Sequence, residues 1–183
     1  MDRVYSQMMG ALIRIAVCGA CTFLATGQVR ADQKEFKVKV AFIYNFLKFI
    51  EWPGDSMNSA TEPIEICVIG TGPIPTMLND LSIRKVQSRP IAITHIKDPQ
   101  ALPPCHLLYI NRSEEVHLPT LLQRIQRTPV LTVSDMPRFA HKGGMIGFAI
   151  EENHVKIEIS QKSVRQAGLK VRAKLLEIAR LVP

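Results

Sequence analysis

The sequence has few aromatic residues, and its basic residues do not gather into one stripe. Phe, Trp and Tyr make up 6% of the 183 residues, and 23 Lys and Arg outnumber 16 Asp and Glu. A groove for single-stranded nucleic acid needs clustered basic residues and aromatic rings on which bases stack. The sequence therefore predicts no nucleic-acid partner. We interpret the scattered basic residues as solvated helix faces, with an acidic protein or anionic lipid as the alternative partner.

Catalytic and metal-binding motifs are also missing. The five histidines are dispersed without the local spacing of zinc ligands, and no GxSxG motif is present. A glycine loop, GTGPIP at residues 70–75, lacks both the lysine of a P-loop and the third glycine of a dinucleotide fingerprint. These absences predict a protein that is not an enzyme and holds no cofactor and no metal. A hydrolase that uses Asp135 or His141 is the remaining enzymatic alternative.

The first residues have the layout of a secretory signal peptide. Arg3 and Arg14 supply a positively charged start, residues 15–25 are uncharged and apolar, and Val29 and Ala31 offer small side chains before a cleavage site. The apolar stretch is too short to span a bilayer comfortably. We therefore expect residues 1–31 to be removed on export to the periplasm, and residues 32–183 to form one domain. An uncleaved N-terminal anchor is the alternative.

Cysteine is scarce, with four residues in the whole chain. Cys18 and Cys21 lie in the expected signal peptide, whereas Cys67 and Cys105 remain in the exported domain. An even pair in an oxidising compartment forms a disulfide by default. Two buried free thiols are the first alternative. A metal site that includes the adjacent Cys105 and His106 is the second.

The exported part alternates strand-length apolar runs with helical patterns. Asp32 is placed to cap an amphipathic helix that Pro53 ends. Ser160 is placed to cap the last helix in the same way. The helices are expected at residues 32–52, 76–81, 118–125 and 162–180. The strands are expected at residues 64–69, 91–96, 107–110, 130–133, 145–150 and 155–159.

The order of these elements predicts the fold class. Strand, helix and strand in succession with short connections indicate a mostly parallel sheet with helices on both faces. The last two strands are joined by a polar connection of hairpin length at residues 151–154, which makes the sheet mixed. Gly143 and Gly144 precede this hairpin, where glycine allows the chain to turn through positive φ. We therefore predict an α/β domain with a mixed, mostly parallel sheet and a C-terminal β-hairpin plus helix.

Two groups of residues are candidates for binding. Ligand sites of α/β proteins often lie where strands end, which selects Gly70, Thr71, Ser134 and Asp135 as a small-ligand site. A helix N-cap is the alternative role for Asp135.

The expected last helix places Arg165, Arg172 and Lys174 beside apolar residues. Mixed basic and apolar surfaces suit protein partners. The alternative is that the apolar residues of this helix face the core and its basic residues are simply solvated.

Several segments of the exported part resemble the YfiR/HmsC-like family, in the same order as in that family. They are KVAFIYNFLKFIEWP, EICVIG, CHLLYI, PVLTVSD, FAHKGGMIGFAIEENHVKIEIS and AGLKVRAKLLEIARLV. Together they cover nearly the whole exported part, so the resemblance is specific although each motif is short.

The resemblance implies a periplasmic regulator without catalytic residues. Such proteins bind the periplasmic part of an inner-membrane diguanylate cyclase and hold it inactive, which restrains cyclic-di-GMP signalling and biofilm formation. An outer-membrane lipoprotein that sequesters the regulator and a second copy of the chain are further expected partners. The resemblance also implies that Cys67 and Cys105 form the family disulfide. Some members carry a second Cys pair near the hairpin, which this chain lacks.

Overall fold

The computed structural model describes residues 32–54 and 62–183. The expected signal peptide lies outside these residues. Residues 37–183 form one compact unit, and residues 32–36 belong to a separate one. All the strands lie in the first of these units, so the fold below is that of residues 37–183.

An eight-stranded sheet forms the centre of the fold, in the order β10-β8-β7-β6-β5-β2-β4-β3. From β4 to β7 neighbouring strands are parallel, β8 is antiparallel to β7, and β10 runs parallel to β8. The predicted mixed, mostly parallel sheet is therefore confirmed. The strands are β2 (Ile64–Ile69), β3 (Lys85–Val86), β4 (Arg89–Ile96), β5 (Leu107–Ile110), β6 (Leu131–Ser134), β7 (Ile146–Glu151), β8 (His154–Ser160) and β10 (Ala179–Val182).

The short helices are α2 (Pro73–Leu78), η2 (Asn79–Ile83), η3 (Arg112–His117), α3 (Leu118–Arg124), η4 (Phe139–Lys142), α4 (Gln161–Gln166) and α5 (Ala173–Leu176). A separate two-stranded sheet pairs β1 (Ile50–Glu51) with β9 (Lys170–Val171). The first helix was predicted to reach Trp52, but it ends at residue 49 because the chain then enters β1.

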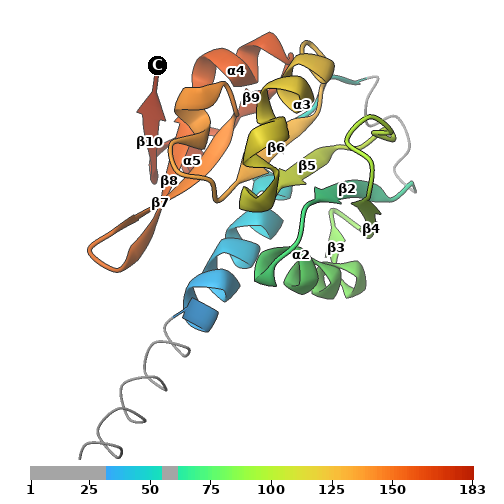
Figure 1. Ribbon diagram of the computed structural model, residues 1–183, viewed down its shortest axis with the longest axis horizontal. Helices are drawn as coiled ribbons and strands as arrows, with labels where there is room; N and C mark the ends of the chain where they lie inside the picture. Colours follow the sequence, from blue (N-terminus) through green and yellow to red (C-terminus); the bar gives the residue numbers. More distant parts are fainter. Residues whose placement is uncertain (1–31, 55–61) are drawn as a thin grey trace, which may run out of the picture. The chain divides into compact units, whose positions relative to one another are not determined.

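The two faces of the large sheet are covered by different helices (Figure 1). On one face, α3 and η4 pack against the central strands, with Leu121 and Phe139 fully buried against Leu108. On the other face, the Phe46 ring of the helix over residues 37–49 stacks 5.9 Å from the ring of Phe148 in β7. Each side of the sheet thus buries a continuous apolar layer, which stabilises the domain in proportion to the area removed from water.

The hairpin of β7 and β8 follows its prediction closely. The connection turns through Glu152 and Asn153, whose φ angles are +50° and +60°. Two consecutive residues with positive φ are typical of the tight turn that matches the twist of the flanking strands. Ser160 also accepts a hydrogen bond from the N–H of Ser163 over 3.3 Å, which confirms it as the N-cap of α4.

A helix follows the hairpin as predicted, but its predicted extent over residues 162–180 is wrong, because the segment is divided into α4, β9, α5 and β10. Helix α4 is six residues long, and Gly168 follows at φ +73° while the Leu169 N–H donates to the Val164 carbonyl. Glycine in the left-handed region is a frequent helix stop. The segment beyond it pairs twice with distant strands, as β9 with β1 and as β10 with β8. Ile178, just before β10, is 61% exposed.

Gly143 and Gly144 play different roles before β7. Gly143 has φ +96° and supplies the predicted turn through positive φ. Gly144 is required for space, because a Cβ atom there would lie 2.2 Å from Cε1 of Phe139, whose side chain is fully buried. No flexible side chain can move aside at that position.

We expect Gly144→Ala to lower the free energy of unfolding by about 1–3 kcal/mol, since the added methyl group forces a buried ring to shift. Urea denaturation followed by circular dichroism measures the change. Gly54→Ala is the matched control, because a Cβ at Gly54 meets nothing within 4 Å, and its effect should stay within about 0.5 kcal/mol. Equal stabilities of the two variants would contradict this account.

Candidate functional site

The four residues predicted as a ligand site lie at one edge of the sheet. Gly70 and Thr71 follow β2, and Ser134 and Asp135 lie at the end of β6. Strands β2, β5 and β6 are parallel, so their carboxyl ends meet at this edge. The sequence therefore located the edge correctly. Whether it binds a ligand depends on which of its polar groups remain available.

The glycine loop after β2 is closed by the segment after β5. The Thr71 N–H donates to the Ser113 hydroxyl over 3.0 Å. Gly70 has φ +94°, and a Cβ there would lie 2.5 Å from Ser113 Oγ. The loop is held against η3 by these contacts. The conformation of the glycine loop allows it to pack closely against the segment after β5. The Thr71 N–H is already hydrogen-bonded, so it is not available to a ligand.

Asp135 is committed to the protein itself. The Tyr109 hydroxyl donates to its Oδ1 over 2.9 Å, and Lys39 Nζ lies 3.8 Å from its Oδ2. The carboxylate side chain is 10% exposed. The alternative role as a helix N-cap is wrong, because Arg138 occupies that position before η4.

Burial and the neighbouring carboxylate fix the protonation of Tyr109. Burial, then the charge and hydrogen bond of Asp135, raise the pKa of Tyr109 far above its usual range. The phenol therefore stays protonated and remains a donor to Asp135. Ser134 is buried too, and its hydroxyl accepts the Met136 N–H over 3.0 Å. We conclude that this edge of the sheet is filled by internal polar contacts.

The two cysteines lie beside each other as free thiols. Cys67 is buried in β2, and Cys105 is partly buried just before the neighbouring strand β5. A side-chain hydrogen bond with Cys67, followed by burial, raises the pKa of the Cys105 thiol far above its usual range. Both side chains belong to the apolar layer under α3. This placement is compatible with the expected disulfide. Neither cysteine is an exposed surface residue.

The three basic residues predicted for partner binding are all exposed, but they lie on two separate short helices, α4 and α5. Arg165 is in α4 and contacts Gln161 over 3.4 Å. Arg172, the N-cap residue of α5, forms an ion pair with Glu51 of β1, with 2.9 Å between Nε and Oε1. Lys174 lies in α5. They do not form the single helix face that the sequence suggested.

A surface that sequence reasoning missed lies along the free edge of β10. This strand pairs with β8 on one side only and ends the sheet. Ile178 is 61% exposed just before the strand, and Leu181 within it is 49% exposed. Arg180 between them pairs with Glu151 of the hairpin. We call Lys174, Ile178, Leu181 and the free edge of β10 the C-terminal surface.

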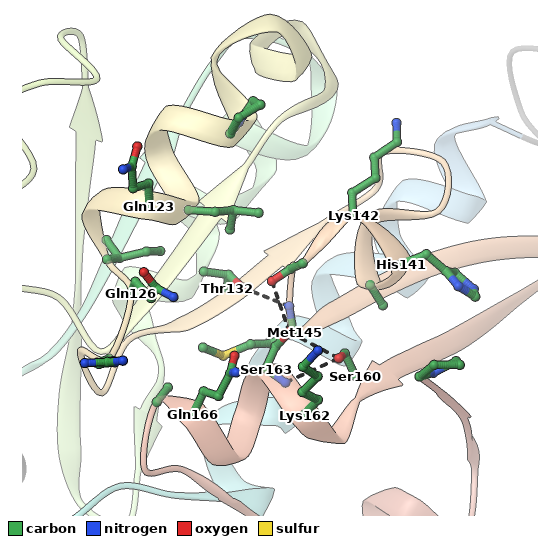
Figure 2. Close-up of a pocket in the computed structure, with 18 residues that line it drawn as sticks. Gln123, Gln126, Thr132, His141, Lys142, Met145, Ser160, Lys162, Ser163 and Gln166 are labelled. Carbon is green, nitrogen blue, oxygen red and sulfur yellow. Dashed lines mark hydrogen bonds between the residues drawn. The ribbon is translucent and has the colours of Figure 1, made fainter.

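Two cavities lie away from the strand-end residues. One of about 490 Å³ is bounded by α3, η4 and α4 and is shown in Figure 2. The other, of about 740 Å³, lies beside Cys105 and is walled largely by prolines and apolar side chains. Neither cavity is lined by Gly70, Thr71, Ser134 or Asp135. Both are assembled from separate segments of the chain, so no local motif could have revealed them.

Two further findings concern only residues 32–54 and 62–183. None of the helices there combines the length and the apolar character needed to cross a lipid bilayer. No three side chains of His, Cys, Asp or Glu in those ranges are grouped as metal ligands would be. His106 instead accepts the Glu65 N–H at its Nδ1 over 3.0 Å.

A family model described as YfiR/HmsC-like matches residues 36–180. No curated protein matches the chain. The matched residues run from within the first helix to Arg180 in β10.

We expect Tyr109→Phe to lower the free energy of unfolding by about 1–3 kcal/mol, because it leaves a buried carboxylate with one donor fewer. Chemical denaturation at neutral pH measures the loss. Tyr44→Phe is the matched control, since the Tyr44 hydroxyl makes an exposed hydrogen bond of 2.9 Å to the Lys85 carbonyl. Its removal should cost clearly less, and a reversed order would contradict the role given to Asp135.

We also expect the thiols of Cys67 and Cys105 to be joined in the oxidised exported protein. The bond would close a loop of roughly 40 residues, so its reduction should lower stability by about 2–4 kcal/mol. Cys105→Ala should then destabilise the oxidised protein and have little effect under reducing conditions. Two titratable thiols in the oxidised protein would contradict the disulfide.

Proposed function

The chain belongs to the YfiR/HmsC-like family, and from that premise we propose that it is an exported regulator of an inner-membrane diguanylate cyclase. It acts in the periplasm, binds the periplasmic part of the cyclase and holds the enzyme inactive. Loss of the protein therefore raises cyclic-di-GMP and promotes biofilm formation. The observation that carries this proposal is the family match over residues 36–180.

The polar contacts of the described residues support a binding role over a catalytic one. The buried carboxylate of Asp135 is occupied by Tyr109 and Lys39, so it is not available as a general base. His141 lies exposed on η4, and the part of the chain that the structure describes gives it no nucleophile or carboxylate as a hydrogen-bond partner. A hydrolase would need such a pair within hydrogen-bond reach.

We propose the C-terminal surface as the contact with the cyclase. An edge strand presents unpaired backbone N–H and C=O groups to which another strand can add. Ile178 and Leu181 supply apolar side chains on the same segment, and large exposed apolar groups rimmed by polar ones are typical of protein interfaces. Lys174 on the adjoining helix α5 adds a positive charge that steers an acidic partner.

The contacts of Arg165, Arg172 and Lys174 indicate which of these basic residues belongs to the proposed contact with the cyclase. The charge of Arg172 is partly neutralised by Glu51, and that pair also ties β9 to β1. Arg165 lies on α4, before the glycine that ends the helix. We therefore retain Lys174 as the basic residue of the contact, with Arg165 and Arg172 outside its centre. No feature of the described residues supports the lipoprotein or the second copy of the chain, and we do not propose either.

A small-ligand-binding protein is the second candidate, and the cavity in Figure 2 favours it. The two candidates differ in their consequences. A ligand binder that acts alone has no effect on cyclase output when it is deleted. A regulator raises cyclic-di-GMP when it is deleted, whether or not it also binds a ligand.

We expect Lys174→Glu and Leu181→Glu each to raise cellular cyclic-di-GMP toward the level of the gene deletion. Each change should weaken the complex about fivefold to tenfold or more, as the loss of one interface anchor does. Lys97→Glu and Ile83→Glu are the matched controls, because both positions are exposed and lie outside the C-terminal surface. Thermal melting of the purified variants checks that all four remain folded.

Two outcomes distinguish a wrongly placed contact surface from a wrong regulatory function. If deletion raises cyclic-di-GMP but Lys174→Glu and Leu181→Glu do not, the contact lies elsewhere on the protein. If deletion itself leaves cyclic-di-GMP unchanged in cells that contain the cyclase, the regulatory function is wrong.

A further inference from the structure

The cavity between α3, η4 and α4 has an unbalanced charge. Its described lining includes Arg127, His141, Lys142 and Lys162 but no Asp or Glu. Lys142 is paired outside the lining with Glu115, whose pKa its hydrogen bond and charge lower. Arg127 and Lys162 make no ion pair with any residue in the part of the chain that the structure describes. Two side-chain cations therefore border this cavity without a matching Asp or Glu side chain, and Pro183, the last residue of the sequence, also lines it.

A buried hydroxyl at the cavity has an unused hydrogen. Thr132 is 1% exposed and lines the cavity. Its Oγ1 accepts the Met145 N–H over 2.9 Å, as the dashed line in Figure 2 shows. No acceptor for the hydroxyl hydrogen occurs among residues 32–54 and 62–183. Buried donors are nearly always satisfied, so this hydroxyl is ready to donate to a bound molecule.

The remaining lining suits a small molecule that is part polar and part apolar. Gln123, Gln126 and Gln166 come from the two sides of the cavity, and Figure 2 shows them around Met145 and Thr132. Glutamine amides donate hydrogen bonds without adding negative charge. Leu122, Ile125 and Met145 contribute apolar surface. Apolar surface beside polar groups that can orient a bound molecule is typical of small-ligand sites, although polar residues are more numerous in this lining.

The other two hydroxyl groups at the cavity, those of Ser160 and Ser163, lie 3.1 Å apart and are hydrogen-bonded to each other. The Ser163 hydroxyl donates to the Gly143 carbonyl over 3.1 Å, and Ser160 Oγ accepts the Ser163 N–H. These bonds fix the start of α4 against the turn before β7. The wall of the cavity is thus held in place without a ligand, which reduces the entropy that binding has to overcome.

We propose that this cavity binds a small organic anion, one carboxylate or phosphate group on an apolar body. Arg127 and Lys162 attract the anionic group, the Thr132 hydroxyl and the glutamine amides donate to its oxygens, and Leu122, Ile125 and Met145 cover its apolar part. A volume of about 490 Å³ accommodates a ligand of the size of an aromatic acid. The site does not depend on the proposed regulatory function.

Binding is tested with four probes by NMR titration of the ¹⁵N-labelled exported protein. Benzoate and phenyl phosphate carry the two anionic groups on the same apolar body, benzyl alcohol lacks the charge, and inorganic phosphate lacks the apolar body. We expect one or both aromatic anions to shift the amide signals of Thr132, Met145 and Gln166. Benzyl alcohol and inorganic phosphate should bind about tenfold more weakly, since the first lacks the anionic group and the second lacks the apolar body.

A charge-matched pair of variants tests the residues. Arg127→Gln with Lys162→Gln should weaken binding of the aromatic anion about tenfold or more. Arg84→Gln with Lys97→Gln removes the same two charges at exposed positions outside the cavity and should leave the affinity unchanged. Thr132→Val should weaken binding of the anion, but it should also lower the melting temperature, because it leaves the buried Met145 N–H without its acceptor. Thr132→Ser keeps the hydroxyl and should therefore retain the affinity. An unchanged melting temperature of the two double variants shows that their fold is retained.

The proposal is overturned by any of three results. The first is that neither aromatic anion shifts these signals at millimolar concentration. The second is that benzyl alcohol binds as tightly as the anions, which would make the cavity a purely apolar pocket. The third is that the two double variants lose affinity equally. The weaker binding would then result from the lower net charge of the protein and not from the loss of Arg127 and Lys162.

Discussion

The contact of Asp135 with Tyr109 and Lys39 is the constraint on which the arrangement of this protein depends. It joins the end of β6, the neighbouring strand β5 and the helix over residues 37–49 through one buried carboxylate. A charge with this little exposure is tolerated only when donors surround it. The helix is therefore fixed to one face of the sheet by a polar contact as well as by the packing of Phe46 on Phe148.

This contact also decides where the protein can bind other molecules. In many α/β proteins the carboxyl ends of the strands hold the ligand, but here that edge is occupied by internal bonds of Asp135, Ser134 and Thr71. The unused polar groups lie elsewhere, at Thr132 in the cavity and along the free edge of β10. The candidate sites thus lie where polar groups are not already hydrogen-bonded within the fold.

The sequence predicted those parts of the fold that local patterns determine. The hairpin of β7 and β8 was found because its alternation and its polar turn are contained in one short segment. The segment after Gly168 was misread as helix because its pairing partners, β1 and β8, are far away in the sequence. Gly168 was the available signal, since a glycine one residue after a short helix is typical of a C-terminal stop. The cavity had no such signal, because Arg127 and Thr132 lie about thirty residues before Lys162 in the sequence and no local motif joins them.

The two candidate sites share one structural element, and this limits how they can influence each other. Strand β8 pairs with β10 at the C-terminal surface, and its last residue, Ser160, lines the cavity and caps α4. Proximity alone does not make a ligand a regulator. An anion in the cavity changes the affinity for the cyclase only if it binds the partner-bound and free forms with different affinities, and the partner then changes the affinity for the anion by the same factor. A titration of the anion with and without the partner therefore measures the coupling from either side.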